Sequence, residues 1–250
     1  MPVRTEEGRK IRAAFVPREG WIMLSADYSQ IELRLLAHYS RDPILVEAFE
    51  QDQDIHSRTA SEVFQLLPGM LTQEMRRQAK VINFGIIYGM GPFRLSKELG
   101  ISHKMAKTYI DQYFDRYNGV KRYIEETIEA ARETGEVKTL LGRYRRLPDI
   151  LSRNRTAREF AERTAVNTPL QGTAADLIKI AMVWIHNAFD SEGMKAQMLL
   201  QVHDELVFEV PPEELKATEK CVREKMEGVY DLSVPLKVDI KTGKNWAKLE

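Results

Sequence analysis

Residues 21–38, WIMLSADYSQIELRLLAH, decide the fold of this chain. The apolar run 21–24, followed by small residues, predicts a strand, and apolar residues at helical spacing then predict a helix ending near His38. Asp27 lies where this strand gives way to a turn. A carboxylate at the tip of a buried strand is held rigidly, as binding of a metal ion or a reacting phosphate requires. Capping of the following helix, with Ser29 as a second candidate cap, is the simpler interpretation of the same residue.

The bulk composition limits the classes of protein that this chain can represent. Its 250 residues, 43% of them hydrophobic, suffice for one large domain or two small ones. The 37 basic and 37 acidic residues give zero net charge, so nucleic-acid binding would require a local basic patch. The single cysteine, Cys221, excludes an internal disulfide. With no secretory signal and no apolar run near the roughly 20 residues that span a bilayer, we expect a cytoplasmic protein without membrane contact.

Strand patterns cluster at the two ends of the sequence, and helical patterns fill its middle. This order predicts an α+β fold that is mostly helical, with a small antiparallel sheet and an inserted helical subdomain. The abrupt start, which leads almost at once into a core strand, suggests a fragment of a longer chain. Three further elements are predicted from the sequence. Residues 4–15 should form a turn or short strand, residues 153–165 and 170–189 two helices separated or kinked at Pro169, and residues 234–240 a last strand.

A second carboxylate lies within residues 198–210, MLLQVHDELVFEV, where two strand-like runs flank His203, Asp204 and Glu205. An ordinary hairpin turn is one interpretation, although this turn lacks the usual glycine and carries three ionisable groups. If the two strands are neighbours, Asp27 and Asp204 lie within reach of one divalent cation. Mg²⁺ is typically held by one or two carboxylates together with substrate phosphates, and paired ions are a standard route to in-line phosphoryl transfer.

The sequence predicts a helix that begins after the cap Thr72 and runs to about Tyr88. The segment 75–90, MRRQAKVINFGIIYGM, carries two cations and then two aromatic residues at steps of four. Arg76, Lys80, Phe84 and Tyr88 therefore share one face, which spans about 18 Å. Its length and order of side chains fit the phosphates, sugar and base of a nucleoside triphosphate. An amphipathic helix with a solvated basic end is the alternative, but the two rings would then extend a solvated stripe without a partner.

Three segments resemble the polymerase motifs of family A DNA polymerases, in the same order and at similar separations. They are DYSQIELR at 27–34, RRQAKVINFGIIYG at 76–89 and QVHDELVFEV at 201–210. The resemblance implies a monomeric DNA-directed DNA polymerase of replication and repair, which uses two Mg²⁺ ions and deoxynucleoside triphosphates to extend primer–template DNA. It also implies a palm sheet split by fingers, with the thumb absent. The implied ranges are palm 1–41, fingers 42–117 and palm 118–250, with 118–134 as a linking helix.

The resemblance also assigns roles at the reacting phosphate. Asp27 and Asp204 would bind the two metal ions, with the backbone carbonyl of Tyr28 as a further ligand and Glu205 beside the metals. Lys80 would protonate the departing pyrophosphate.

The same resemblance assigns contacts to the incoming nucleotide and to the DNA. Arg76 and Lys80 would hold the triphosphate, Phe84 would lie against the sugar, and Tyr88 would stack near the template-side pocket. Glu32 would be the steric gate that crowds a ribose 2′-hydroxyl. The remaining matches are Arg4, Gln30 and His56 around the nucleotide, and Arg143, Arg145, Arg146, Arg163, Asn167, Gln171 and His203 along the DNA.

A local basic patch fits this interpretation, because residues 138–163 include eight basic and three acidic residues. A solvated positive loop is the simpler alternative. For the whole chain, the runner-up is a catalytically weak or inert nucleic-acid-binding fragment that lacks the thumb and an earlier palm segment. A single-chain RNA polymerase is disfavoured by Glu32, and a two-metal nuclease would have no use for the face from Arg76 to Tyr88.

Overall fold

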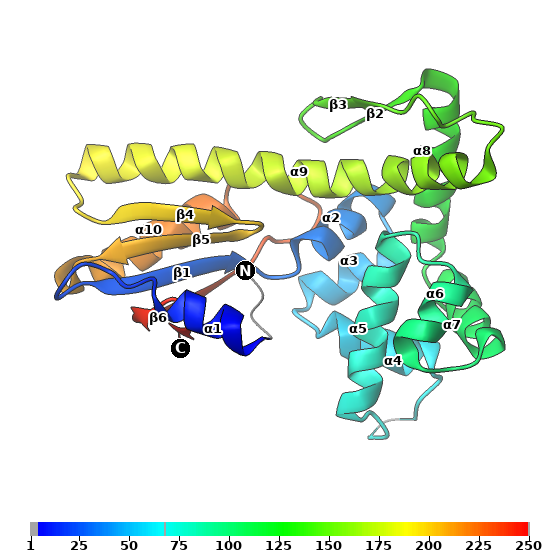
Figure 1. Ribbon diagram of the computed structural model, residues 1–250, viewed down its shortest axis with the longest axis horizontal. Coiled ribbons are helices and arrows are strands. Elements are labelled where there is room, and N and C mark those ends of the chain that lie inside the picture. Colours follow the sequence, from blue (N-terminus) through cyan, green and yellow to red (C-terminus); the bar gives the residue numbers. More distant parts are fainter. Residues whose placement is uncertain (1–4, 68, 250) are drawn as a thin grey trace. The chain divides into compact units, whose positions relative to one another are not determined.

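The computed structural model describes residues 5–67 and 69–249 (Figure 1). The chain forms two compact units. The sheet unit comprises Met1–Ile31, Ala174–Asp231 and Leu236–Glu250, and the helical unit comprises Glu32–Thr173 and Leu232–Pro235. The predicted α+β fold, with its sheet built from the two ends of the chain, is confirmed. Among the described residues, none of the helices combines the length and apolar character needed to cross a bilayer.

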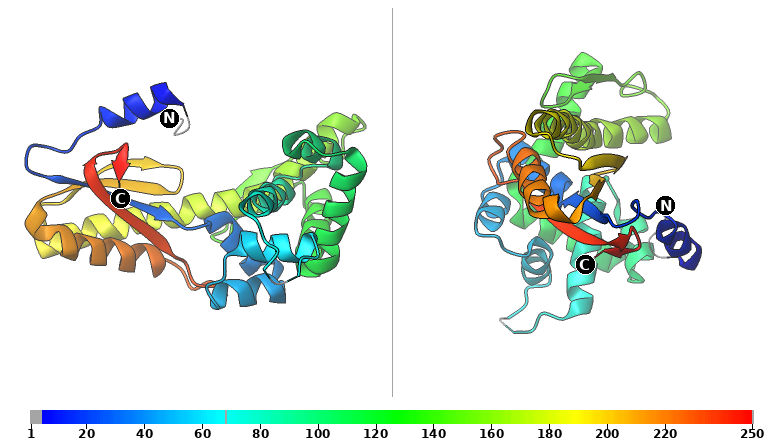
Figure 2. Two further views of the ribbon diagram at one scale, coloured as in Figure 1. Left: turned by 90° about the horizontal axis from the view of Figure 1, so that it is seen from below. Right: turned by 90° about the vertical axis from the view of Figure 1, so that its left-hand side faces the viewer.

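The sheet unit is built on five antiparallel strands in the order β4-β5-β1-β6-β7. Leu24 and Ala26 of the central strand β1 are fully buried. Helix α10 packs against β1 and β6, and α1 lies on the opposite side of the sheet (Figure 2). The bounds are α1 Glu6–Ala13, β1 Ile22–Tyr28, β4 Gln197–Val202, β5 Glu205–Val210, η1 Pro212–Glu214, α10 Leu215–Glu227, β6 Val238–Asn245 and β7 Lys248–Leu249.

Helix α1 corrects the expectation of a turn or short strand over residues 4–15. The hydroxyl of Thr5 accepts a hydrogen bond from the backbone N–H of Gly8 at 3.1 Å and so caps the helix. Acidic residues occupy the first turn and basic residues the last, which complements the helix dipole. The sequence signals for this helix are its cap and its charged ends.

Two strand boundaries also differ from expectation. Strand β1 continues to Tyr28, so Asp27 lies within the strand and four residues before helix α2, which begins at Ile31. Asp27 is therefore not at the N-cap position of that helix. The last long strand begins at Val238 rather than at residue 234 and continues to Asn245. Pro235 cannot donate a ladder hydrogen bond, and its carbonyl instead accepts from Arg34 at 2.6 Å.

The helical unit contains a succession of short helices, several of them capped by side-chain oxygens. Thr72 accepts from the N–H of Met75, and Ser102 accepts from that of Met105. Asp42 caps α3 and also accepts from the backbone of Gly119, which fixes the start of α8. The bounds are α2 Ile31–Ser40, α3 Pro43–Glu50, α4 Ile55–Val63, α5 Gln73–Ile87, α6 Pro92–Leu99, α7 His103–Arg116, α8 Asn118–Thr134, β2 Glu136–Lys138 and β3 Tyr144–Arg146.

Helix α9, Arg155–Glu192, is continuous through Pro169, so of the two expected alternatives, separation or a kink at Pro169, separation is wrong. Proline removes one backbone hydrogen bond and would end an isolated helix. Here Ala165, Val166 and Leu170 are buried around it, and this packing outweighs the local preference. The helix belongs to both units, because the division falls between Thr173 and Ala174.

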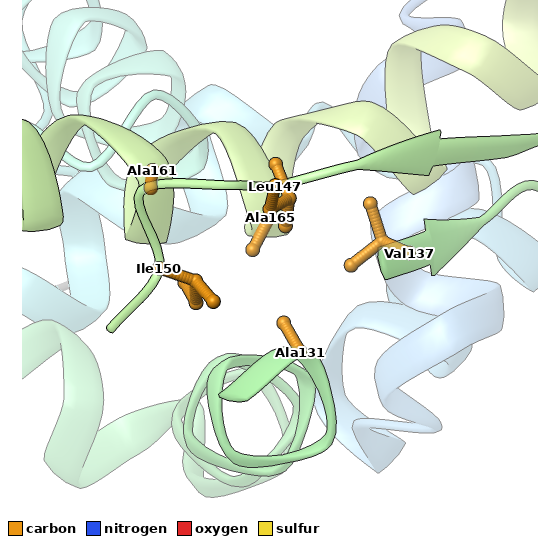
Figure 3. Packing of buried hydrophobic residues seen from close by; sticks show 6 residues of the cluster. All are labelled: Ala131, Val137, Leu147, Ile150, Ala161 and Ala165. Atoms are coloured by element: carbon orange, nitrogen blue, oxygen red, sulfur yellow. The ribbon is translucent and has the colours of Figure 1, made fainter. Parts of the chain in front are cut away.

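The β2–β3 hairpin is anchored by its own apolar cluster (Figure 3). Val137 and Leu147 from the hairpin pack with Ala131 of α8 and with Ala165 of α9. Arg145 and Arg146 of β3 are exposed. The hairpin is thus held between two helices by its apolar residues, while its charged residues remain open to solvent.

Candidate active site

The sheet brings carboxylates together at one end of β1. Asp27 lies directly opposite Glu205 of β5 and Asp239 of β6. Opposed residues of antiparallel strands project on the same face, so these side chains form a row across three strands. Asp204 precedes β5, and its backbone carbonyl accepts from the N–H of Tyr28 at 3.2 Å. The prediction that the strands bearing Asp27 and Asp204 are neighbours is confirmed.

Asp204 occupies a tight turn between β4 and β5. His203, the first residue of the turn, has a φ of +56°, the left-handed conformation that two-residue hairpin turns require. Its carbonyl accepts from the side-chain amide of Gln201 at 2.6 Å. The turn is therefore formed without glycine, and it presents Asp204 at the end of strand β1.

Burial and neighbouring negative charges raise the pKa of Asp27. Partial burial, followed by the negative charges of Asp204, Glu205 and Asp239, raises the pKa of Asp27 to about 7, against the opposing effect of Arg12. Burial also raises the pKa of Asp204. Asp27 nevertheless remains open to solvent, because protein atoms crowd its carboxyl group without closing over it. Such an accessible anionic cluster favours a divalent cation.

The donor set fits Mg²⁺ when substrate phosphates and water complete the coordination. Within residues 5–67 and 69–249, no three His, Cys, Asp or Glu side chains are arranged to hold a metal ion by themselves. Asp27, Asp204 and the Tyr28 carbonyl provide oxygen ligands of the kind that Mg²⁺ uses. Glu205 is already engaged, since it accepts hydrogen bonds from Ser25 and Trp246 and pairs with Arg12.

Sequence reasoning missed the surroundings of Glu205 and the carboxylate of Asp239. In the sequence, Ser25 is only a small residue at the end of an apolar run, and nothing indicates that its hydroxyl reaches Glu205. Arg12 and Trp246 are far from Glu205 in the sequence, and no local pattern joins them. The expected strand 234–240 contains Asp239, but no sequence pattern fixes its register against β1, so the pairing of Asp239 with Asp27 was not predicted.

Helix α5 lies in the helical unit (Figure 1). It carries the predicted mixed face of basic and aromatic residues. Lys80 and Tyr88 are exposed, and the rings of Phe84 and Tyr88 stack with centroids 6.4 Å apart. Ile82 and Ile86 are buried, so the helix is amphipathic as expected.

Arg76 at the start of this face is paired with the helix cap Asp54. Its Nε donates to the Asp54 carboxylate at 2.5 Å. Although partial burial opposes the shift, hydrogen bonds from Arg76 and Ser57 lower the pKa of Asp54 to about 2. Both side chains of the pair are partly exposed, so a phosphate could compete for the guanidinium.

His56 lies beside Phe84 with its protonation fixed by its neighbours. The imidazole is 3% exposed, and burial lowers its pKa to about 4, so it is neutral near pH 7. The Asn83 side-chain amide nitrogen lies 3.0 Å from Nδ1, while the Asn83 oxygen accepts from Thr59. The amide therefore donates to Nδ1, which leaves Nε2 as the protonated nitrogen.

Glu32 and Tyr88 are joined directly. The Tyr88 hydroxyl donates to the Glu32 carboxylate at 2.8 Å, so the predicted steric gate and the end of the aromatic stripe are coupled. The next residue, Gly89, has a φ of +63°, and a Cβ there would lie 2.6 Å from Cγ of Arg163. Only glycine allows Arg163 of α9 to pack so closely against the end of α5.

The remaining predicted residues occupy varied settings. The Arg143 guanidinium donates to the Gly172 carbonyl at 2.9 Å, which ties the hairpin to α9. The side-chain oxygen of Asn167 is buried without a hydrogen-bond partner among the described residues. Gln171 and His203 are exposed.

Two predicted nucleotide contacts complete the set. Gln30 adopts a φ of +56° between β1 and α2, and its buried side-chain oxygen has no hydrogen-bond partner within the described part of the chain. Arg4 lies outside the described residues.

The small sheet, its paired carboxylates and the helical insertion define an α+β chain with a candidate cation site. The model of DNA polymerase family A matches residues 1–248. The chain therefore belongs to DNA polymerase family A.

Individual relatives agree with this family. The chain is 52% identical over 247 residues to DNA polymerase I of Bacillus subtilis (strain 168), and 51% identical over 246 residues to the thermostable DNA polymerase I of Thermus filiformis. Each match covers 98% of this chain but only 28% and 29% of the respective relative. The chain thus spans less than a third of these proteins.

A solved structure supports the fold. The POL domain of Pol1 from M. smegmatis, in complex with DNA primer-template and dNTP, matches with a TM-score of 0.94 and 46% sequence identity. The match covers 98% of this chain and 44% of that one.

Proposed function

We propose that this chain is the core of a DNA-directed DNA polymerase, which transfers deoxynucleotides to a primer 3′-hydroxyl under the direction of a template. The observation that carries the proposal is the juxtaposition of Asp27 on β1 with Asp204 in the turn before the adjacent strand β5, where burial raises the pKa of both carboxyl groups. Family membership and the M. smegmatis complex with primer-template and dNTP add support. The partners would be primer–template DNA and deoxynucleoside triphosphates, and the chain would act as a monomer in replication and repair.

In this proposal Asp27, Asp204 and the Tyr28 carbonyl hold two Mg²⁺ ions, with Glu205 beside them. When bound, the ions would lower the pKa of the primer hydroxyl and stabilise the charge of the departing pyrophosphate. The sheet's own contribution is positional. Because β1 is paired on both sides through Asp27, the carboxylate stays in place while substrates come and go.

The helical unit would bind the nucleotide. Arg76 would exchange its Asp54 partner for a phosphate, and Lys80 would contact the triphosphate and donate a proton to pyrophosphate. Phe84 would lie against the sugar, with the neutral His56 nearby. Tyr88 would hold Glu32, so that the Glu32 carboxylate obstructs a 2′-hydroxyl. Arg4 and Gln30 are further proposed contacts to the nucleotide.

The DNA would follow the basic hairpin and α9. The exposed Arg145 and Arg146 suit phosphate contacts, which position a duplex without reading its sequence. The proposed division into subdomains is palm 1–41, fingers 42–117 and palm 118–250. The further proposed DNA contacts are Arg143, Arg163, Asn167, Gln171 and His203.

Primer extension with Mg²⁺ tests this function. We expect the chain to extend a primer on its template, and we expect Asp204→Ala to abolish extension. The second candidate is a fragment that binds nucleic acid without catalysis, since the chain covers 28% of its full-length relatives. Absence of extension at high protein and DNA concentration, together with retained DNA binding, would favour that second candidate.

A further inference from the structure

The carboxylate of Glu205 is held by three donors from distant parts of the sheet unit. The Ser25 hydroxyl donates to Oε1 at 2.6 Å, and the indole Nε1 of Trp246 donates to the same oxygen at 2.8 Å. The Arg12 guanidinium lies 3.3 Å from Oε2. These donors come from β1, from the turn after β6 and from α1. Helix α1 and the turn after β6 therefore meet at a residue that lies opposite Asp27.

The donors are themselves fixed. Trp246 is 2% exposed and packs on Met23 and Val207 of the sheet. Its backbone N–H donates to the carbonyl of Phe15 at 3.1 Å, and the two rings meet edge to face. The Arg12 guanidinium lies 4.0 Å from the centre of the Trp246 ring, and the Arg12 side chain is only 13% exposed. The indole thus orients both Glu205 and Arg12.

This arrangement changes what Glu205 can do. Oε1 already accepts two short hydrogen bonds, and the adjacent guanidinium offsets the negative charge of the carboxylate. Moving Glu205 onto a cation would break these bonds and leave Arg12 partly buried without its counter-ion. The charge of Arg12 also acts on Asp27 and lowers its pKa. Among the described residues, however, the hydrogen bonds of Arg12 and of the Trp246 indole to a carboxylate go to Glu205, which leaves Asp27 and Asp204 as the carboxylates available to a cation.

Strand β5 carries a second cluster of glutamate, arginine and tryptophan, four residues further along. Arg18 donates through Nε to Glu209 at 2.9 Å, and its guanidinium lies 4.1 Å from the centre of the Trp21 ring. The Arg18 side chain is 47% exposed, and Glu209 lies opposite Met23 rather than opposite an aspartate. This cluster supplies a matched control, because the residue types are the same and the candidate cation site is absent.

We propose that Arg12 and Trp246 are positioning residues, which hold Glu205 as a locally neutralised carboxylate and leave Asp27 and Asp204 as the pair that binds the divalent cation. The inference rests on the proposed function and adds two residues to its machinery. Releasing Glu205 would provide a third carboxylate that captures the ion away from the productive arrangement. Cation binding would then tighten while turnover falls, whereas general damage to the sheet would weaken both.

The primary test measures Mn²⁺ binding by electron paramagnetic resonance, with kcat for primer extension measured in parallel. For Trp246→Phe and for Arg12→Gln we expect about fivefold tighter Mn²⁺ binding, because a mobile carboxylate is gained or a nearby positive charge is lost. We expect kcat to fall about tenfold through misplacement of the ion. Arg12→Lys keeps the charge and should restore most of the Mn²⁺ affinity of the unmodified chain. The controls Trp21→Phe and Arg18→Gln should change neither quantity.

A double variant shows whether Trp246 acts through Glu205. In the Glu205→Gln background, Trp246→Phe should no longer tighten Mn²⁺ binding, because the competing carboxylate is gone. Weaker or unchanged Mn²⁺ binding in Trp246→Phe would overturn the proposal, as would equal effects of the Arg18 and Trp21 variants. Far-UV circular dichroism establishes that each variant is folded. If Trp246→Phe does not fold, Ser25→Ala takes its place, because it also removes a hydrogen-bond donor to Glu205 and changes the side chain less.

Failure of the proposed function gives a different result. If this sheet does not bind cations, Asp204→Asn will leave Mn²⁺ binding unchanged. If the sheet binds cations but the positioning inference is wrong, Asp204→Asn will weaken binding while Trp246→Phe does not tighten it. The binding measurement decides the positioning inference even when the chain extends no primer.

Discussion

The sheet unit and the helical unit carry opposite charges, and they fix their side chains by different means. Around Asp27, the carboxylates belong to paired strands and the turn that joins two of them, so backbone hydrogen bonds set their positions. On α5, Arg76 and Lys80 extend from a single helix, and Arg76 is held by an ion pair with Asp54. Backbone hydrogen bonds between paired strands suit a cation site that must keep its geometry. In a partly exposed ion pair, by contrast, a substrate phosphate can replace the carboxylate partner. The zero net charge of the chain conceals this separation.

The largest expected effect tests the sheet side of this comparison. Replacing Asp204 by Asn removes a charged ligand while keeping the size of the side chain, and we expect kcat for primer extension to fall by about 10³-fold or more. Asp190→Asn is the control, because Asp190 is an exposed carboxylate on α9 of the same unit. Equal kcat for the two variants would contradict a catalytic role for Asp204.

On the helical side, Lys80→Ala should lower kcat by about 10²-fold, since it removes both a phosphate contact and a proton donor. Lys107→Ala on α7 is the matched control, because Lys107 is an exposed lysine paired with Asp111. Single-turnover primer extension measures both. If Lys80→Ala changed only KM, the side chain would bind the nucleotide without acting in the chemical step.

The pH dependence of cation binding tests the raised pKa of Asp27 in the sheet unit. The raised pKa of Asp27, about 7, means that protons compete with a cation below neutral pH. Mn²⁺ affinity should therefore fall as pH decreases through 7, by up to about tenfold per pH unit. In the absence of metal, the pH dependence of stability has the opposite direction to that of Mn²⁺ affinity. Because the pKa of Asp27 is raised in the folded state, this carboxyl group makes the fold less stable as pH rises between about 4 and 7. Titration of Mn²⁺ binding at several pH values, with Asp27→Asn as the control, checks the first effect.

The smallest expected effect concerns the bond between Tyr88 and Glu32. Tyr88→Phe removes one partly exposed hydrogen bond, worth about 1 kcal/mol or less. We expect discrimination against ribonucleotides to fall severalfold, because Glu32 loses its restraint. Competing primer extension with ribonucleotides and deoxynucleotides measures this ratio. Tyr109→Phe on α7 is the control, and an unchanged ratio in Tyr88→Phe would show that Glu32 needs no support from Tyr88.

Particular elements show how far sequence reasoning reached. The central strand, the face of α5 and the turn at Asp204 were predicted, because each is encoded by a contiguous pattern of apolar and charged residues. Helix α1 was missed because its signals are a cap and charged ends. The continuity of α9 was missed because burial around Pro169 outweighs a local preference against helix.

The α+β fold, the family and the residue types at both candidate sites could be predicted from the sequence, since strand alternation and helical spacing are local properties. Which distant residues meet could be learned only from the folded chain. The pairing of β1 with both β5 and β6 brings Asp239 beside Asp27 and carries Trp246 to Glu205. No local pattern encodes these contacts, because they form only when strands far apart in the chain settle into one hydrogen-bonded register.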